Sequence, residues 1–288
     1  MTEAAVPSLA PAPASAPSLT VYRDAPSYQG LRTAGLGQFR CPDAASGAAL
    51  IAETVSALRA EGFEAVIGPM DGDTWHSYRL VTESDGSPPF LMEPVNPPFH
   101  VEAFARAGFA PVSTYVSARA PLDGAASDPA AGSAVTDDVT VAPWNGADVE
   151  RFMADVFALS SEAFAQNPFY KPLSRDGFDA LYRPMLGRID PRLMLFAHDR
   201  DGALLGFVFG LPDLLSPASR TAILKTYASR RRGVGRLLAE AFHRAAREAG
   251  FVQVIHALMH EENVSRDRSG LHGGAVFRRY ALFGRVLA

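Results

Sequence analysis

The spacing of apolar side chains predicts a helix followed by a buried strand in the last third of the chain. In residues 234–249, apolar or small side chains recur every three to four positions, and Gly250 stands where such a helix would end. The next residues, 251–259, are almost continuously apolar, which is typical of a strand that is buried on both faces.

The same patterns predict further elements before this pair. Two apolar runs at 193–197 and 203–211 are joined by Asp-Arg-Asp-Gly, a sequence that favours a hairpin turn. Helical spacing predicts helices at 148–165 and 178–187. The remaining predicted strands are 139–141 and 221–228. Strands and helices that alternate in this way predict an α/β fold with a mixed sheet.

A helix–Gly–Phe–strand unit occurs twice in the sequence. Residues 59–67 and 247–255 are identical at five positions without a gap, with an offset of 188 residues. The match favours an internal duplication. The alternative is that helix–Gly–strand units recur in any α/β protein.

Two segments rich in Ala, Pro, Ser and Gly divide the chain. Residues 1–18 have the composition of a disordered tail, and residues 120–137 have that of a linker. The chain of 288 residues is 48% hydrophobic, enough for two cores of modest size. We therefore predict two domains, at 19–119 and 138–288.

Charge and cysteine content exclude several classes of function. The net charge is −4, which argues against nucleic acid as a partner. The most apolar stretch, 203–211, is far shorter than the about 20 residues of a membrane span. A single cysteine, Cys41, excludes an internal disulfide and a Cys-rich zinc site. We predict a cytoplasmic protein with no metal and no membrane partner, and leave a homo-oligomer open.

A basic loop lies between the predicted strand 221–228 and the helix 234–249. Four arginines and two glycines occur within residues 230–236. Backbone N–H groups and the dipole at a helix N-terminus favour an anion, glycines allow close approach, and arginines add charge-assisted hydrogen bonds. The loop suits a pyrophosphate group. The alternative is a solvated basic turn.

The spacing Arg230-x-x-Gly233-x-Gly235 resembles the acetyl-CoA pyrophosphate loop of the GNAT N-acetyltransferase superfamily. The resemblance implies two GNAT-like acyl-CoA N-acyltransferase folds in tandem, with a degenerate N-terminal copy and a final short helix. It also implies acetyl-CoA as co-substrate. The cofactor-binding residues implied in this way are Thr226, Tyr227, Ala228, Arg230, Arg231, Arg232, Gly233, Val234, Gly235, Arg236 and Asn263.

The catalytic and substrate-binding residues are less constrained by the resemblance. His272 and Tyr280 are candidate proton donors to the departing thiolate, and Glu261 is a candidate base. The structural alternatives are a surface loop histidine for His272, a core tyrosine for Tyr280 and a solvated glutamate for Glu261. His256, inside an apolar strand, is better explained as a hydrogen-bonded core residue. The resemblance places Glu162, Phe169 and Tyr170 in the acceptor pocket, where Phe169 has a core alternative.

The function predicted is acetyl-CoA-dependent N-acetylation of a small-molecule or peptide amine, by direct attack in a ternary complex. The alternatives are a non-catalytic acyl-CoA-binding or interaction protein, and an RNA-associated protein that uses the arginines. In the first domain, Pro42 and Asp43 stand where the basic loop would be, and a carboxylate there would repel a pyrophosphate. We therefore expect one cofactor per chain, with Trp75, His76 and Tyr78 as further candidates for the acceptor pocket.

Overall fold

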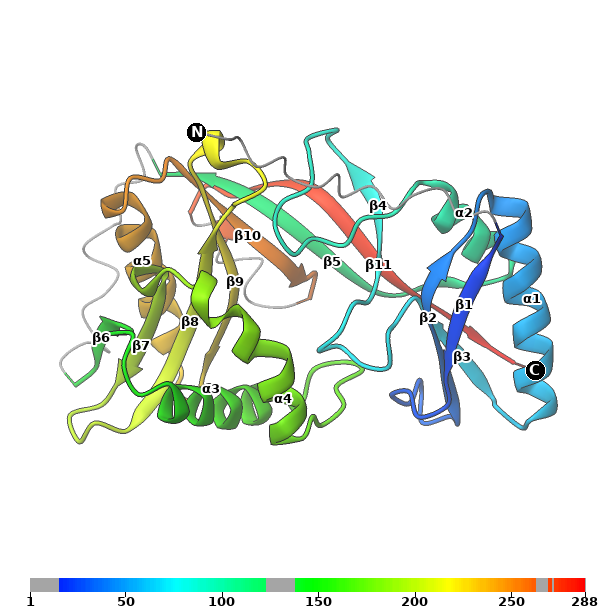
Figure 1. The fold of residues 1–288 in the computed structure, drawn as a ribbon, viewed down its shortest axis with the longest axis horizontal. Coiled ribbons are helices and arrows are strands. Elements are labelled where there is room, and N and C mark those ends of the chain that lie inside the picture. Colours follow the sequence, from blue (N-terminus) through cyan, green and yellow to red (C-terminus); the bar gives the residue numbers. More distant parts are fainter. Residues whose placement is uncertain (1–15, 123–137, 263–268, 271, 288) are drawn as a thin grey trace. The chain divides into compact units, whose positions relative to one another are not determined.

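The chain forms two compact units in the computed structural model, which describes residues 16–122, 138–262, 269–270 and 272–287 (Figure 1). The first unit takes Met1–Tyr115, Asn167–Lys171 and Arg278–Ala288, and the second takes Val116–Gln166 and Pro172–Phe277. The units are therefore not the two consecutive blocks 19–119 and 138–288. The C-terminal residues belong to the first unit, and residues 116–122 belong to the second.

The first unit contains a mixed sheet, with both antiparallel and parallel pairs, and two helices. Its strand order is β1-β2-β3-β11-β5, and β4 pairs with β11. Its elements are β1 (Ser18–Tyr22), β2 (Thr33–Arg40), α1 (Ala44–Ala60), β3 (Ala65–Gly68), β4 (Leu80–Ser84), α2 (Phe99–Arg106) and parts of β5 (Ala110–Pro121) and β11 (Ala275–Val286). The short helix expected after Asn263 falls largely outside the described residues, where only Ser269 and Gly270 are described, as helical, before β11.

The segments predicted as tail and linker lie largely outside the described residues. Positions 1–15 and 123–137 are in this category. Strand β1 begins at Ser18, and β5 extends to Pro121, so both predicted boundaries fall inside strands.

The second unit contains the elements that the apolar spacing predicted. Its strand order is β5-β10-β9-β8-β7-β6. Its elements are β6 (Thr140–Pro143), α3 (Val149–Phe164), α4 (Arg175–Tyr182), β7 (Met194–His198), β8 (Leu204–Pro212), β9 (Thr221–Ser229), α5 (Val234–Glu248) and β10 (Gln253–His260). The predicted helix 178–187 is α4 followed by a 3₁₀ segment, Arg183–Arg188. The predicted mixed α/β fold is confirmed.

Helix α5 forms the core of the second unit through one apolar face. Val234, Leu238, Phe242 and Ala246 follow at intervals of four residues and are fully buried against strands β7 to β9. Gly250 has φ +90°, which ends the helix and allows the turn into β10.

The repeated unit found in the sequence is part of a larger repeat in the backbone. Strands β2 and β3 are parallel and pair Thr33 with Ala65, whereas β9 and β10 are parallel and pair Thr221 with Gln253. Both pairs are separated by 188 residues from their counterparts. The helices α1 and α5 each connect the two paired strands.

Equivalent hydrogen bonds close both copies of the repeat. The amide N–H of Glu64 donates to the Arg32 carbonyl, and that of Val252 donates to the Arg220 carbonyl, both at 2.9 Å. The Arg32 and Arg220 guanidinium groups each donate at 2.8 Å to a carbonyl in the turn after the helix. These repeated contacts support an internal duplication.

Gly210 on β8 provides a test of the packing of α5 on the sheet. A methyl group at this position would overlap the ring of Phe242. We expect Gly210→Ala to lower the free energy of unfolding by about 1–3 kcal/mol, the usual cost of overpacking. Gly187→Ala is the matched control, because a methyl group there would meet no atom within 4 Å. Chemical denaturation measures both, and equal midpoints for the two variants would contradict this packing.

Candidate functional site

Strands β9 and β10 part in the middle of the second unit. Their parallel pairing runs from Thr221 and Gln253 to Leu224 and His256. Beyond that point β9 continues to Ser229 in pairing with β8, after a register shift next to Phe209. The predicted cofactor residues Thr226, Tyr227 and Ala228 therefore lie on the part of β9 that is outside the β9–β10 ladder.

The predicted pyrophosphate loop connects this part of β9 to α5. Gly233 is the N-cap residue of α5, has φ +92° and offers no side chain to the first N–H groups of the helix. The first turn of α5 contains no acidic residue, and Val234 and Gly235 are buried. A helix start of this kind can donate its N–H groups to an anion.

Three of the four loop arginines form ion pairs with carboxylates. Arg230 Nε donates to Glu162 at 2.7 Å, and Arg236 Nε donates to Glu240 at 2.7 Å. Arg231 donates two hydrogen bonds to Asp138, at 2.8 and 3.0 Å. The guanidinium group lowers the pKa of Asp138. These pairs lie at the surface, where solvent weakens them, so an anionic ligand can displace them.

Arg232 is exposed, as is Arg230, and it forms no ion pair within the described part of the chain. Asn263, the last of the predicted cofactor residues, lies outside the described residues. Glu261 is half-buried in the turn after β10.

The predicted substrate residues are divided between the two units. Glu162 belongs to the second unit, where it contacts Arg230. Phe169 and Tyr170 belong to the first unit, because Asn167–Lys171 is part of it. Phe169 stacks on Tyr28, with ring centroids 6.1 Å apart.

Trp75, a further candidate for the acceptor pocket, contacts the same segment. Its ring packs against Tyr170 with centroids 6.1 Å apart, and its Nε1 donates to the Lys171 carbonyl at 2.9 Å. His76 Nδ1 lies 2.7 Å from an Asp73 carboxylate oxygen. Burial raises the pKa of Tyr78, whose ring lies under the Arg79 guanidinium group.

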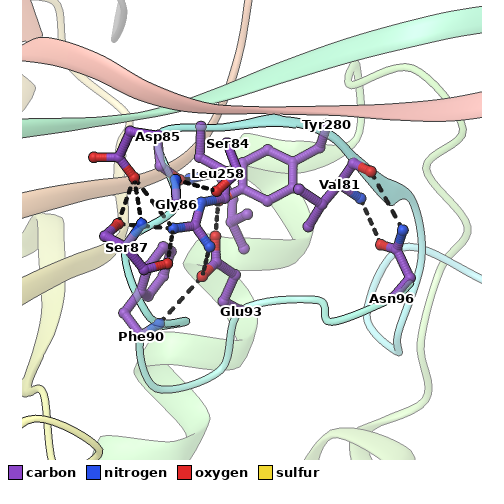
Figure 2. Close-up of polar contacts among 12 residues, drawn as sticks. Val81, Ser84, Asp85, Gly86, Ser87, Phe90, Glu93, Asn96, Leu258 and Tyr280 are labelled. Carbon is purple, nitrogen blue, oxygen red and sulfur yellow. Dashed lines mark hydrogen bonds and ion pairs between the residues drawn. The ribbon is translucent and has the colours of Figure 1, made fainter. Parts of the chain in front are cut away.

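Tyr280 is a core residue of the first unit. It is 1% exposed on β11, and its hydroxyl donates a hydrogen bond to the Glu93 carboxylate (Figure 2). Arg278 donates to the same carboxylate at 3.1 Å and to the Ser87 carbonyl at 2.7 Å. The sequence placed Tyr280 in the domain of the cofactor loop, but β11 pairs with β3 and β4 and carries it into the first unit.

His272 belongs to a cluster of three histidines in the second unit. Its half-buried ring stacks on His243 of α5, with centroids 4.1 Å apart and an interplanar angle of 11°. His243 Nδ1 lies 2.7 Å from the Ala239 carbonyl oxygen, and its Nε2 lies 3.0 Å from Nε2 of His256. His256 Nδ1 lies 2.6 Å from the Ser269 hydroxyl. The interpretation of His256 as a hydrogen-bonded core residue is confirmed.

Burial keeps the three imidazoles neutral. It lowers the pKa of His243 to about 4 and that of His256 well below its usual value. Burial also lowers the pKa of His272; Glu240 opposes this shift and Arg236 adds to it. A histidine that is neutral at pH 7 has one unprotonated ring nitrogen, and the role of His272 as a proton donor stays a prediction.

Solved structures with a similar fold are known, whereas no protein-family profile and no curated protein matches the sequence. A GCN5-related N-acetyltransferase from Sphaerobacter thermophilus has a similar structure, with a TM-score of 0.52 and 15% identity over 88% of this chain and 73% of that one. A tandem GNAT protein from the clavulanic acid biosynthesis pathway gives 0.53 and 16%, over 88% and 75%. A GCN5-related N-acetyltransferase from Anabaena variabilis gives 0.52 and 10%, over 93% and 59%.

The expected resemblance to the GNAT superfamily is confirmed at the level of the fold. The chain has a GNAT-like mixed α/β fold, and one of the similar structures is a tandem protein. Among the described helices, none is both long and apolar enough to cross a membrane.

The neutral histidines predict a loss of stability in acid. Each imidazole has a lower pKa in the folded chain than the about 6.5 of an unfolded one, so below pH 6.5 the unfolded state binds more protons. The stability is therefore complete above pH 6.5 and falls as the pH approaches 4, by up to about 1.4 kcal/mol per pH unit for His243.

Denaturation of His243→Gln at pH 7 and pH 5 tests this linkage. We expect the variant to lose less stability between the two values than the wild type, because one buried imidazole is gone. His198→Gln, outside the cluster, should behave as the wild type. An equal loss in His243→Gln and the wild type would contradict the assignment.

Proposed function

We propose that this protein is an acetyl-CoA-dependent N-acetyltransferase. The observation that carries the proposal is the parting of β9 and β10 next to the start of α5. There the N-cap residue is Gly233, and no side chain caps the helix. The GNAT-like fold supports it, because both features lie in the second unit at the sequence that resembles the GNAT cofactor loop. The acceptor is an amine of a small molecule or peptide.

The start of α5 is the proposed pyrophosphate site. Its first N–H groups donate to the phosphate oxygens, and Gly233 and Gly235 keep side chains away from the anion. Arg230, Arg231 and Arg236 exchange their carboxylate partners for the phosphates. Doubly anionic pyrophosphate competes well for these exposed guanidinium groups.

The acetyl group is proposed to lie along the part of β9 that extends beyond its pairing with β10. Backbone N–H groups near Thr226–Ala228 stabilise the oxyanion that forms when an amine attacks the thioester carbonyl. The amine displaces the CoA thiolate directly, so the reaction needs no covalent intermediate and no metal.

A non-catalytic acyl-CoA-binding protein is the second candidate. The location of Tyr280 in the first unit favours it, since one predicted proton donor is bound to Glu93 in a core. Release of free thiol from acetyl-CoA with a panel of primary amines separates the two functions. An enzyme releases thiol only when an amine is accepted, whereas a binding protein releases none.

The first unit is proposed to lack a second cofactor site. The Asp43 carboxylate accepts a hydrogen bond from Ser46 N–H at 2.8 Å and so caps the start of α1. A backbone hydrogen bond to Ser46 lowers the pKa of Asp43, which keeps it charged. An anionic cap repels a pyrophosphate and occupies the donor that it would use.

Gly235→Asp tests the proposed pyrophosphate site by calorimetric titration with CoA. A carboxylate on the first turn of α5 opposes the phosphates, so we expect the affinity to fall at least about tenfold. Gly187→Asp adds the same charge in open space and should bind as the wild type. Unchanged affinity of Gly235→Asp would contradict the site.

The stoichiometry of the same titration tests the difference between the units. We expect one CoA per intact chain, and only the one weakened site in Gly235→Asp. The intact chain is required because β11, from the C-terminal end, belongs to the first unit. Two CoA molecules per intact chain would contradict the proposed difference between the units.

A further inference from the structure

The hydrogen-bond directions in the histidine cluster follow from one carbonyl group. The Ala239 oxygen can only accept, so His243 Nδ1 carries a proton and its Nε2 is an acceptor in the neutral ring. His256 therefore donates from Nε2 to His243, and its Nδ1 accepts from the Ser269 hydroxyl. Both ring nitrogens of His243 and of His256 are committed to these bonds.

His272 differs from the other two histidines. Neither of its ring nitrogens forms a hydrogen bond within the described part of the chain, and its ring is held by stacking on His243. Because it is half-buried, a nitrogen of this ring can reach a ligand without breaking an existing bond in the cluster.

The cluster lies on the helix that starts at the proposed cofactor loop. Arg236, Glu240 and His243 share one face of α5, at positions i, i+4 and i+7. The His272 ring stacks on His243, and its centroid lies 6.1 Å from that of His256 on β10. His256 is the last β10 residue paired with β9, at the point where the two strands part.

We propose that His272 accepts the proton of the acceptor ammonium group in the acetyl transfer, which makes it a catalytic residue. This role rests on the proposed function. The titratable and charged groups around it are Arg236, Glu240 and His243 of α5 and His256 of β10. Arg236 and Glu240 pair with each other at 2.7 Å, so their charges largely cancel.

The proposed step balances in atoms and charge. The ammonium group gives one proton to a nitrogen of His272, and the neutral amine attacks the thioester carbonyl carbon. The C–N bond forms and the C–S bond breaks. The second proton of the adduct leaves with the CoA thiolate as free thiol. The proton on His272 returns to solvent, so one proton is released per acetyl group.

The pH dependence of kcat/KM tests this role with whichever primary amine of the panel is accepted. In the wild type, kcat/KM should rise with an apparent pKa below 6.5 and then level off. His272→Gln should lower it at pH 7 by about 100-fold, a usual effect of losing a general base. Its acetyl-CoA affinity should be unchanged. His198→Gln is the matched control and should keep the wild-type profile.

Two substitutions of His243 test its role as a positioning residue. His243→Phe keeps an aromatic ring for stacking, so the pKa in the rate profile should stay below 6.5. His243→Ala removes the ring and exposes His272, so that pKa should rise toward 6.5. Equal profiles for the two variants would contradict the positioning role.

The outcomes separate this inference from the function on which it rests. A wild-type profile in His272→Gln, with acetyl transfer intact, would overturn the role of His272 alone. A wild-type protein that binds acetyl-CoA but acetylates no amine would contradict the transferase, and with it this role. A protein that does not bind acetyl-CoA would contradict the cofactor site itself.

Discussion

The start of α5, where no side chain caps the helix, is the constraint on which the proposed chemistry depends. A helix needs partners for its first N–H groups, from a side chain, water or a ligand. Gly233 provides no side chain, and its φ of +92° is readily adopted only by glycine. At the start of α1, the Asp43 carboxylate supplies the partner instead. The two copies of one βαβ unit therefore differ at the atoms that an anion would contact.

The same helix connects this site to the histidine cluster. One face of α5 packs Val234, Leu238 and Phe242 onto the sheet, and a second face carries His243. Burial that stabilises the helix also removes water from the imidazoles and so keeps them neutral. A stable core and the proposed proton acceptor thus depend on the same packing.

The sequence predicted the parts of the fold that depend on local periodicity. Helix α5, strand β10 and the β7–β8 hairpin were predicted because burial on one face leaves a regular apolar pattern. The repeat was only partly recognised. Arg-Thr-Ala-x-Leu occurs at 32–36 and at 220–224, at the same offset of 188 residues, and would have extended it.

Features that depend on distant segments could not be predicted. The apolar pattern of β11 would suit a strand in either unit. Only its pairing with β3 and β4 puts Tyr280 beside Glu93. The carboxylate partners of Arg230 and Arg231 lie 68 and 93 residues away in the sequence. The histidine cluster likewise joins α5, β10 and Ser269, which no spacing along the chain brings together.

The most direct measurement is a crystal structure of the full chain with CoA bound. The pyrophosphate oxygens should lie within hydrogen-bond distance, about 3 Å, of backbone N–H groups in the loop from Gly233 to Arg236. Arg231 should have left Asp138 for a phosphate. CoA bound at α1, or at a place where these N–H groups make no contact with it, would contradict the assignment of the second unit as the cofactor-binding unit.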